Sequence, residues 1–135
     1  MSNATPLPED EVFHSLYGWF LGHVASLALD PEACCESQGN YNVAHELWYF
    51  IRNDQLPRNS GEILSAAQWA AVDDLCKSVA EVPENARRWT TFASESVENM
   101  RNDAWRPARV KAQYLLKVLA PITELLDRTA HEPPR

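Results

Sequence analysis

Apolar residues recur at intervals of three and four along most of the chain, which predicts helices and no strand. The first predicted helix runs from about Glu9 to Leu29 and begins with acidic residues, which favour the positive end of the helix dipole. Its apolar stripe consists of Phe13, Leu16, Tyr17, Phe20, Val24 and Leu27. A second flank holds Gly18, Gly22, Ala25 and Leu29. We expect this small-residue flank to let another helix approach closely.

The next segment, 30–40, is polar and rich in turn formers, so a loop is predicted there. A second helix is expected to start near Asn40 or Asn42, either of which would cap it with its side-chain oxygen. Its main stripe is Val43, Ala44, Leu47, Trp48 and Ile51. A row on a neighbouring face holds Tyr41, His45, Tyr49 and Arg52. A helix apolar on most of its circumference is usually central, so this row is where a function of the segment would reside.

Three further helices are predicted after a loop at 53–62. Ser65 and Gln68 fit a capping box, and the helix that they start has the apolar face Trp69, Val72, Leu75, Cys76 and Val79. The next is predicted over Glu84–Asn102, with a face of Ala86, Trp89, Ala93, Val97 and Met100. The last begins at Asp103 and is kinked by Pro121. Its predicted inner side is Val110, Tyr114, Leu115, Val118, Leu119, Ile122, Leu125 and Leu126.

The five predicted helices contain one tryptophan each: Trp19, Trp48, Trp69, Trp89 and Trp105. This pattern predicts an all-α fold, a single compact bundle of about five helices with an aromatic-rich core. The length of 135 residues is typical of one domain. We therefore expect one helical domain over residues 1–135, with flexible tails at 1–8 and 129–135.

The start of the chain carries acidic residues where a secretory leader needs basic and apolar ones, and no apolar run is long enough to span a membrane. The three cysteines, Cys34, Cys35 and Cys76, are an odd number that suits a reducing compartment. A cytoplasmic protein without membrane contact is the expectation.

The sequence contains no complete catalytic or metal-binding motif. His45 and Glu46 match the start of a zinc-protease helix, but position 49 is Tyr where a second His is needed. Cys34 and Cys35 lack the spacer that lets two thiolates share an ion, although they are the nearest candidates for a nucleophile. No glycine-rich phosphate loop is present. We expect no metal, no cofactor, no catalytic residues and no enzymatic activity.

Charge is distributed unevenly along the chain. Residues 1–86 carry a net charge of −10 and residues 87–135 carry +3, for a total of −7. Such acidity repels phosphate backbones and attracts a basic protein. A basic group, Arg87, Arg88, Arg101, Arg106 and Arg109, is an alternative contact for nucleic acid. Ion pairs of these arginines with Glu95, Glu98 and Asp103 explain the group more simply, so no nucleic-acid partner is expected.

The size, acidity and helical character are similar to those of bacterial immunity proteins and antitoxins, which cover basic nuclease toxins. This is an analogy of size and charge, and no residue motif carries it. The first hypothesis is therefore an inhibitor of a basic protein of the toxin class, acting as a monomer or homodimer. Its predicted partner-binding residues are Glu32, Glu36, Tyr41, His45, Glu46, Tyr49, Arg52 and Asp54.

Two other functions fit the same sequence. A small-ligand-binding or enzymatic protein would use a pocket around Tyr41, His45, Tyr49 and Arg52, where His exchanges protons near neutral pH. A homodimeric scaffold would use the small-residue flank of the first helix. Sedimentation separates the scaffold from the other two.

Overall fold

The computed structural model describes residues 8–57 and 63–131, and these residues are helical with no strand. The all-α prediction is confirmed. The α-helices are α1 Pro8–Leu27, α2 Pro31–Ser37, α3 Val43–Ile51, α4 Ala66–Ala80, α5 Ala93–Arg101 and α6 Arg106–His131. Two short 3-10 helices, η2 Glu84–Ala86 and η3 Asp103–Trp105, flank α5. The predicted tails lie mostly outside the described residues, although α1 includes Pro8 and α6 continues to His131.

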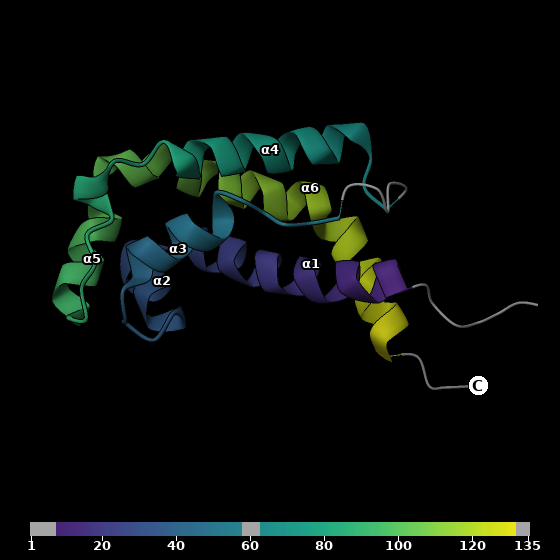
Figure 1. The fold of residues 1–135 in the computed structure, drawn as a ribbon, viewed down its shortest axis with the longest axis horizontal. Helices are drawn as coiled ribbons and strands as arrows, with labels where there is room; N and C mark the ends of the chain where they lie inside the picture. Colours follow the sequence, from purple (N-terminus) through teal and green to yellow (C-terminus); the bar gives the residue numbers. More distant parts are fainter. Residues whose placement is uncertain (1–7, 58–62, 132–135) are drawn as a thin grey trace, which may run out of the picture.

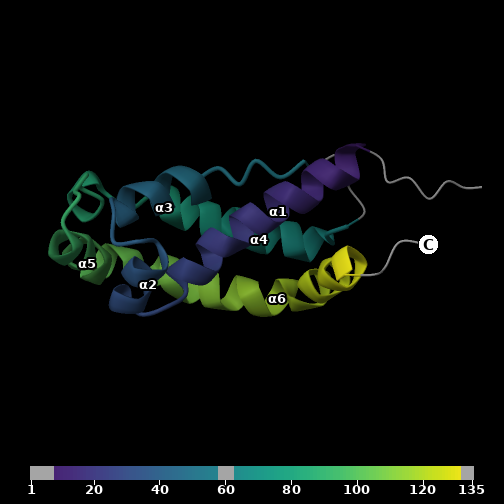
Figure 2. The ribbon, with the colours of Figure 1, turned by 90° about the horizontal axis from the view of Figure 1, so that it is seen from below.

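The long helices form a layered arrangement with α4 and α6 side by side above α1 (Figure 1). Helix α3 lies between α1 and α4, and α2 and α5 pack together at one end of the molecule. Seen from below, α1 crosses obliquely in front of α4 (Figure 2). The described beginning of α1 and the end of α6 therefore lie at the end of the molecule opposite α2 and α5.

The core is mainly aliphatic. Among the five tryptophans only Trp105 is buried, and its Nε1 donates a hydrogen bond to the Ala86 carbonyl at 2.7 Å. Trp19 and Trp89 are 59% and 61% exposed, and Trp48 and Trp69 are partly buried. The predicted stripe of α1 is buried with the exception of Leu16, which is partly buried. The prediction of an aromatic-rich core is therefore not confirmed.

The segment predicted as a loop after α1 forms the short helix α2. Asp30 Oδ1 accepts a hydrogen bond from the Ala33 amide at 3.0 Å, and Pro31 occupies the first turn, where a missing N–H leaves no bond unmade. Helix α2 turns Cys34 and Cys35 into the core, where both are fully buried. The loop prediction was wrong because turn-forming residues also start helices.

Asn42 precedes α3, as predicted, but its side chain does not cap the helix. It lies in the left-handed region at φ 47°, and its Oδ1 accepts a hydrogen bond from the Thr90 amide at 3.2 Å. Its own amide donates to the Thr90 carbonyl at 2.8 Å. The predicted capping box of α4 is confirmed, with Ser65 and Gln68 exchanging hydrogen bonds of 2.8 and 3.1 Å.

The predicted helix over Glu84–Asn102 is interrupted. Residues 87–92 are non-helical between η2 and α5, because Asn42 holds Thr90 and the Asn99 side chain donates to the Arg88 carbonyl at 2.8 Å. Of the predicted apolar face, Ala86 and Met100 are buried, whereas Trp89 and Ala93 are exposed. Long-range hydrogen bonds therefore replace the local helical ones.

Helix α6 buries two of its predicted inner residues, Leu115 and Leu119, together with two alanines that were not predicted to face inward. Its buried positions are Ala108, Ala112, Leu115 and Leu119. Val110, Tyr114 and Leu125, predicted to face inward, are 58%, 62% and 48% exposed. Alanine at two inward positions lets α6 lie close to its neighbours, which leaves the larger side chains outside.

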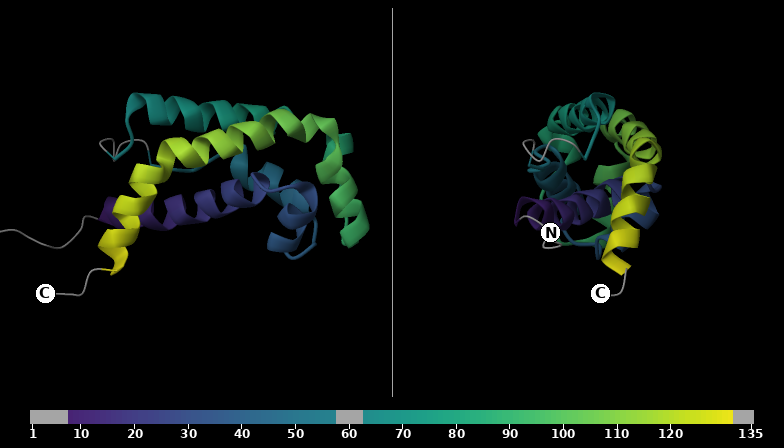
Figure 3. Two further views of the ribbon diagram at one scale, coloured as in Figure 1. Left: turned by 180° about the vertical axis from the view of Figure 1, so that it is seen from behind. Right: turned by 90° about the vertical axis from the view of Figure 1, so that its right-hand side faces the viewer.

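Pro121 lies inside α6, and the C-terminal part of this helix runs in a different direction from the rest (Figure 3). Proline lacks the amide that would reach the carbonyl of residue 117. Side chains from other helices bond to the carbonyls nearby: Tyr17 donates to the Leu119 carbonyl at 3.3 Å, and Gln68 Nε2 donates to the Val118 carbonyl at 3.4 Å. The predicted kink at Pro121 therefore has hydrogen bonds from α1 and α4 beside it.

Candidate functional site

The structure spreads the predicted partner-binding residues over three places. Glu32 and Glu36 are exposed on α2, and Glu32 forms an ion pair with Arg101 of α5. His45, Glu46 and Tyr49 lie on α3, with Tyr41 just before it and Arg52 just after it. Asp54 lies beyond α3, where its Oδ1 accepts a hydrogen bond from the Leu56 amide at 2.8 Å. Glu32 and Asp54 therefore already have partners within the chain.

An aromatic ribbon crosses from α1 to α3. We define it as Trp19, His23, Phe50, Tyr49, His45 and Trp48. Successive ring centroids along it are 5.0, 5.0, 5.2, 6.3 and 5.9 Å apart. Two of its members are large and half exposed, Trp19 at 59% and Tyr49 at 51%. His23 and Phe50, which are half-buried, join these two exposed rings into one run of ring contacts.

Trp48 contacts two guanidinium groups at one end of the ribbon. The Cζ atoms of Arg52 and Arg87 are 4.2 and 3.9 Å from its ring centroid. Arg87 is held in place by a hydrogen bond from its Nε to the Val82 carbonyl at 3.0 Å. Cation–π contacts of this kind stabilise by about 0.5–2 kcal/mol each. Trp48 is therefore fixed, whereas Trp19 and Tyr49 keep ring surface open to solvent.

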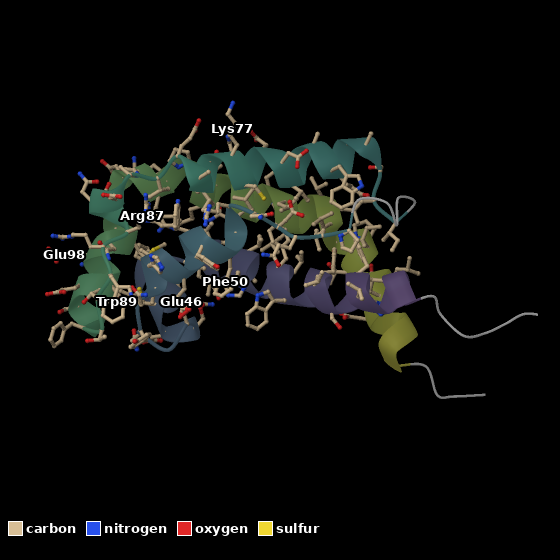
Figure 4. The ribbon with its side chains drawn as sticks, in the orientation of Figure 1. Glu46, Phe50, Lys77, Arg87, Trp89 and Glu98 are labelled. Carbon is tan, nitrogen blue, oxygen red and sulfur yellow. The ribbon has the colours of Figure 1, made fainter. Side chains whose placement is uncertain are left out.

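A second exposed aromatic pair lies near the start of α3. Tyr41 and Trp89 meet edge to face at 5.9 Å, and Phe92 in the same non-helical segment is 65% exposed. Figure 4 shows Trp89, Glu46 and Phe50 following one another along the α5–α3 side, with Lys77 pointing away on α4. The segment 87–92 therefore extends the exposed aromatic surface beyond α3.

The sequence prediction found the α3 row but missed its neighbours. Trp19 and His23 are four positions apart and lie off the buried stripe of α1, which was the available signal for an exposed pair. The Asn42–Thr90 hydrogen bonds hold the segment that contains Arg87 and Trp89 beside the start of α3. Nothing local in the sequence indicates that contact.

The acidic residues of the first two thirds of the chain are distributed over several elements. Glu36 lies on α2, Glu46 on α3, and Asp74 on α4, which is on the opposite side from α2 in Figure 1. Lys111 of α6 contacts Asp74 at 3.0 Å. Cations of the later part of the chain therefore neutralise Asp74 and Glu32, and the aromatic ribbon is a better defined surface than the acidic residues.

The arginines of the predicted basic group bond mostly within the chain. Arg106 pairs with Asp103 at 3.1 Å, which is one of the ion pairs expected from the sequence. Arg109 donates from Nε to the Leu29 carbonyl at 3.1 Å and from Nη2 to the Met100 carbonyl at 2.8 Å. It thereby joins the ends of α1 and α5 to α6, and its desolvation lowers its pKa. Arg109 has a structural role in this fold.

Cys34 and Cys35 are thiols at neutral pH. Burial raises the pKa of Cys34 to about 12 and that of Cys35 to about 11, although the nearby Arg109 guanidinium opposes both shifts. A buried thiol that keeps its proton is a poor nucleophile. In the described part of the chain, no group of three or more His, Cys, Asp or Glu is placed to hold a metal ion.

An open groove of about 880 Å³ lies between α1 and the C-terminal half of α6. Gly18, Gly22 and Ala25, the small-residue flank, lie along it, so this flank does not pack against another described helix. A Cβ atom built on Gly18 or Gly22 has no neighbouring atom within 4 Å. A smaller polar cavity of about 380 Å³ is lined by Arg88, Trp89, Thr90, Glu95, Glu98 and Asn99. Neither space is lined by Tyr41, His45, Tyr49 or Arg52.

Alanine at Gly18 or Gly22 is expected to raise the free energy of unfolding by about 0.5–1 kcal/mol each, because glycine disfavours a helix interior and the added methyl group meets no atom. Urea denaturation followed by circular dichroism measures this. Gly39 is the control: its φ of 75° disfavours alanine, so Gly39→Ala is expected to destabilise the protein. A loss of stability on Gly18→Ala would contradict the absence of neighbouring atoms around a Cβ at this position.

No family model, curated protein or solved structure was found to match this chain. None of the helices in the described ranges has the length and apolar character of a membrane span.

Proposed function

We propose that this protein binds and covers a basic protein, in the manner of an immunity- or antitoxin-type inhibitor, and that it docks through the aromatic ribbon. The observation that carries the proposal is the run of ring contacts that joins the exposed Trp19 and Tyr49 through the half-buried His23 and Phe50. Tryptophan, tyrosine and arginine are the residue types that most often dominate the binding energy of protein interfaces.

The chemistry of the ribbon suits a cationic partner. Arg52 and Arg87 already occupy the ring of Trp48, and Arg52 also lies over Tyr49, with its Cζ 5.4 Å from that ring centroid. Trp19 and Tyr49 are half exposed, and the open part of each ring can receive a lysine or arginine side chain of a partner. Glu46 lies on the same helix as Tyr49 and supplies a carboxylate beside the rings. The net charge of −7 attracts a basic protein over a longer range.

The test begins with affinity capture from the source cell at low and high salt. We expect one stoichiometric basic protein, released by salt because screening weakens the long-range attraction. The captured protein is then purified and its affinity is measured for the unaltered chain and for three variants, Trp19→Ala, Tyr49→Ala and Tyr114→Ala. The last is a matched control, since Tyr114 is 62% exposed on α6 and outside the ribbon.

Trp19→Ala and Tyr49→Ala are each expected to weaken binding by about 30-fold or more, the effect of losing about 2 kcal/mol at an interface hot spot. Tyr114→Ala is expected to change the affinity by less than about twofold. Equal effects of Tyr49→Ala and Tyr114→Ala on the affinity would show that the interface lies outside the ribbon. A captured partner with an acidic surface would contradict the electrostatic part of the proposal.

A further inference from the structure

The groove between α1 and α6 follows both helices for about three turns. On α1 it is lined from His14 to Ala25, which corresponds to a length of about 16 Å at the helical rise per residue. On α6 it is lined from Leu116 to Asp127, on both sides of Pro121. Figure 3 shows the end of α6 turning across the beginning of α1. An elongated groove between two helices has the form in which a third helix binds.

We call five of the lining residues the floor of the groove: Gly18, Leu21, Gly22, Leu116 and Leu126. These residues are apolar or lack a side chain, and the two glycines leave the backbone of α1 uncovered. Glycine inside a helix lowers stability relative to alanine, and no packing within the described chain requires it at either position. A backbone left open in this way accepts close contact with another helix.

The α6 side of the groove is negative. Glu124 and Asp127 are exposed lining residues, and neither forms an ion pair with a described residue. The charge of Asp127 reaches into the groove, because it contributes to the raised pKa of Tyr17, after the larger effect of burial. None of the lining residues is lysine or arginine. His14 Nε2, also in the lining, is covered and has no hydrogen-bond partner within the described chain.

We propose that this groove binds an amphipathic helical segment of a partner protein, with its apolar ridge on Gly18 and Gly22 and its lysine or arginine residues beside Glu124 and Asp127. Charge complementarity selects this occupant, since a second copy of this acidic chain would bring further negative charge to the same rim. The proposal does not depend on the aromatic ribbon, which lies on another face of α1.

The test uses three synthetic peptides of about 14 residues, long enough for three to four helical turns. One has leucines on one helical face and lysines elsewhere, the second has glutamates in place of the lysines, and the third has the lysine composition with the leucines scrambled. Fluorescence anisotropy of the labelled peptides measures binding to the full chain at low salt. We expect the leucine–lysine peptide to bind and the other two to bind much more weakly.

Variants of the chain then test whether the peptide binds in the groove. Gly22→Leu fills the floor, and Glu124→Gln combined with Asp127→Asn neutralises the rim; each is expected to weaken binding by about tenfold or more. The matched controls are Ala70→Leu, an exposed helical position on α4, and the double variant Glu81→Gln with Glu84→Gln. The controls are expected to change binding by less than about twofold. If circular dichroism shows that Gly22→Leu is unfolded, Ala25→Leu replaces it.

Undiminished binding to the floor-filling variant would overturn the proposal, and so would a preference for the glutamate peptide. Sedimentation equilibrium tests the other occupant: a dimer of the unaltered chain that Gly22→Leu dissociates would assign the groove to a second copy. Tyr49→Ala is expected to leave peptide binding unchanged. That result separates a failure of the groove proposal from a failure of the aromatic ribbon.

Discussion

Alanine in place of Trp105 is expected to lower the free energy of unfolding by about 3–5 kcal/mol. Trp105 is the largest fully buried side chain, and its removal leaves a cavity where η2, η3 and α6 meet. It also leaves the Ala86 carbonyl without the hydrogen bond from Nε1. Urea denaturation followed by far-ultraviolet circular dichroism measures the loss.

Two other tryptophan variants make this prediction specific. Trp105→Phe keeps most of the buried ring and loses the hydrogen bond, so a smaller loss of about 1–3 kcal/mol is expected. Trp89→Ala removes a side chain that is 61% exposed and is expected to change stability by about 1 kcal/mol or less. Similar losses for Trp105→Ala and Trp89→Ala would be inconsistent with the burial of Trp105 and the exposure of Trp89.

Alkaline pH is expected to destabilise the protein through Cys34 and Cys35. Their pKa values are raised from 9.0 in the unfolded chain to about 12 and about 11 in the folded chain. The unfolded chain loses these protons first, so the stability is fully present below pH 9.0 and falls as pH rises toward the folded values. Between pH 9 and 11 the contribution of Cys34 corresponds to a loss of about 2–3 kcal/mol.

The measurement is the free energy of unfolding by urea at intervals from pH 7 to 11, for the unaltered chain and for Cys34→Ala combined with Cys35→Ala. Tyr17, whose pKa is also raised by burial, remains in both proteins, so its contribution cancels. The double variant is expected to be less stable at pH 7 and to lose less stability above pH 9. Parallel curves would show that the two thiols are not protected from solvent.

Local patterns predicted those helices whose first residue and buried stripe both depend on residues close together in the sequence. Ser65 and Gln68 placed the beginning of α4, and the stripe from Phe13 to Leu27 placed the buried face of α1. The helix predicted over Glu84–Asn102 failed because Thr90 bonds to Asn42, which is 48 positions away. Helix propensity depends on neighbouring residues, so it does not predict a hydrogen bond between residues this far apart in the sequence.

The candidate site was predictable only in part. The spacing of three and four residues predicted one row, Tyr41, His45, Tyr49 and Arg52, and the structure has His45 and Tyr49 on α3, with Tyr41 just before it and Arg52 just after it. The rings that complete the ribbon come from α1, and Arg87 comes from the segment after η2. Tryptophan is both strongly apolar and polar at its N–H, so composition alone did not distinguish the buried Trp105 from the exposed Trp19.

The bend of α6 beside Pro121 has a geometric consequence for the groove. Tyr17 and Gln68 bond to the Leu119 and Val118 carbonyls just before the bend, and the Tyr17 hydroxyl also lies 2.8 Å from the Thr123 hydroxyl just after it, so α1 holds α6 on both sides of the proline. The angle of the C-terminal turns of α6 thereby determines the width of the groove, whereas the floor residues determine only its depth. A chain that kept this proline and its two hydrogen-bonding neighbours could exchange the side chains of the floor and rim, changing what the groove selects while preserving its shape.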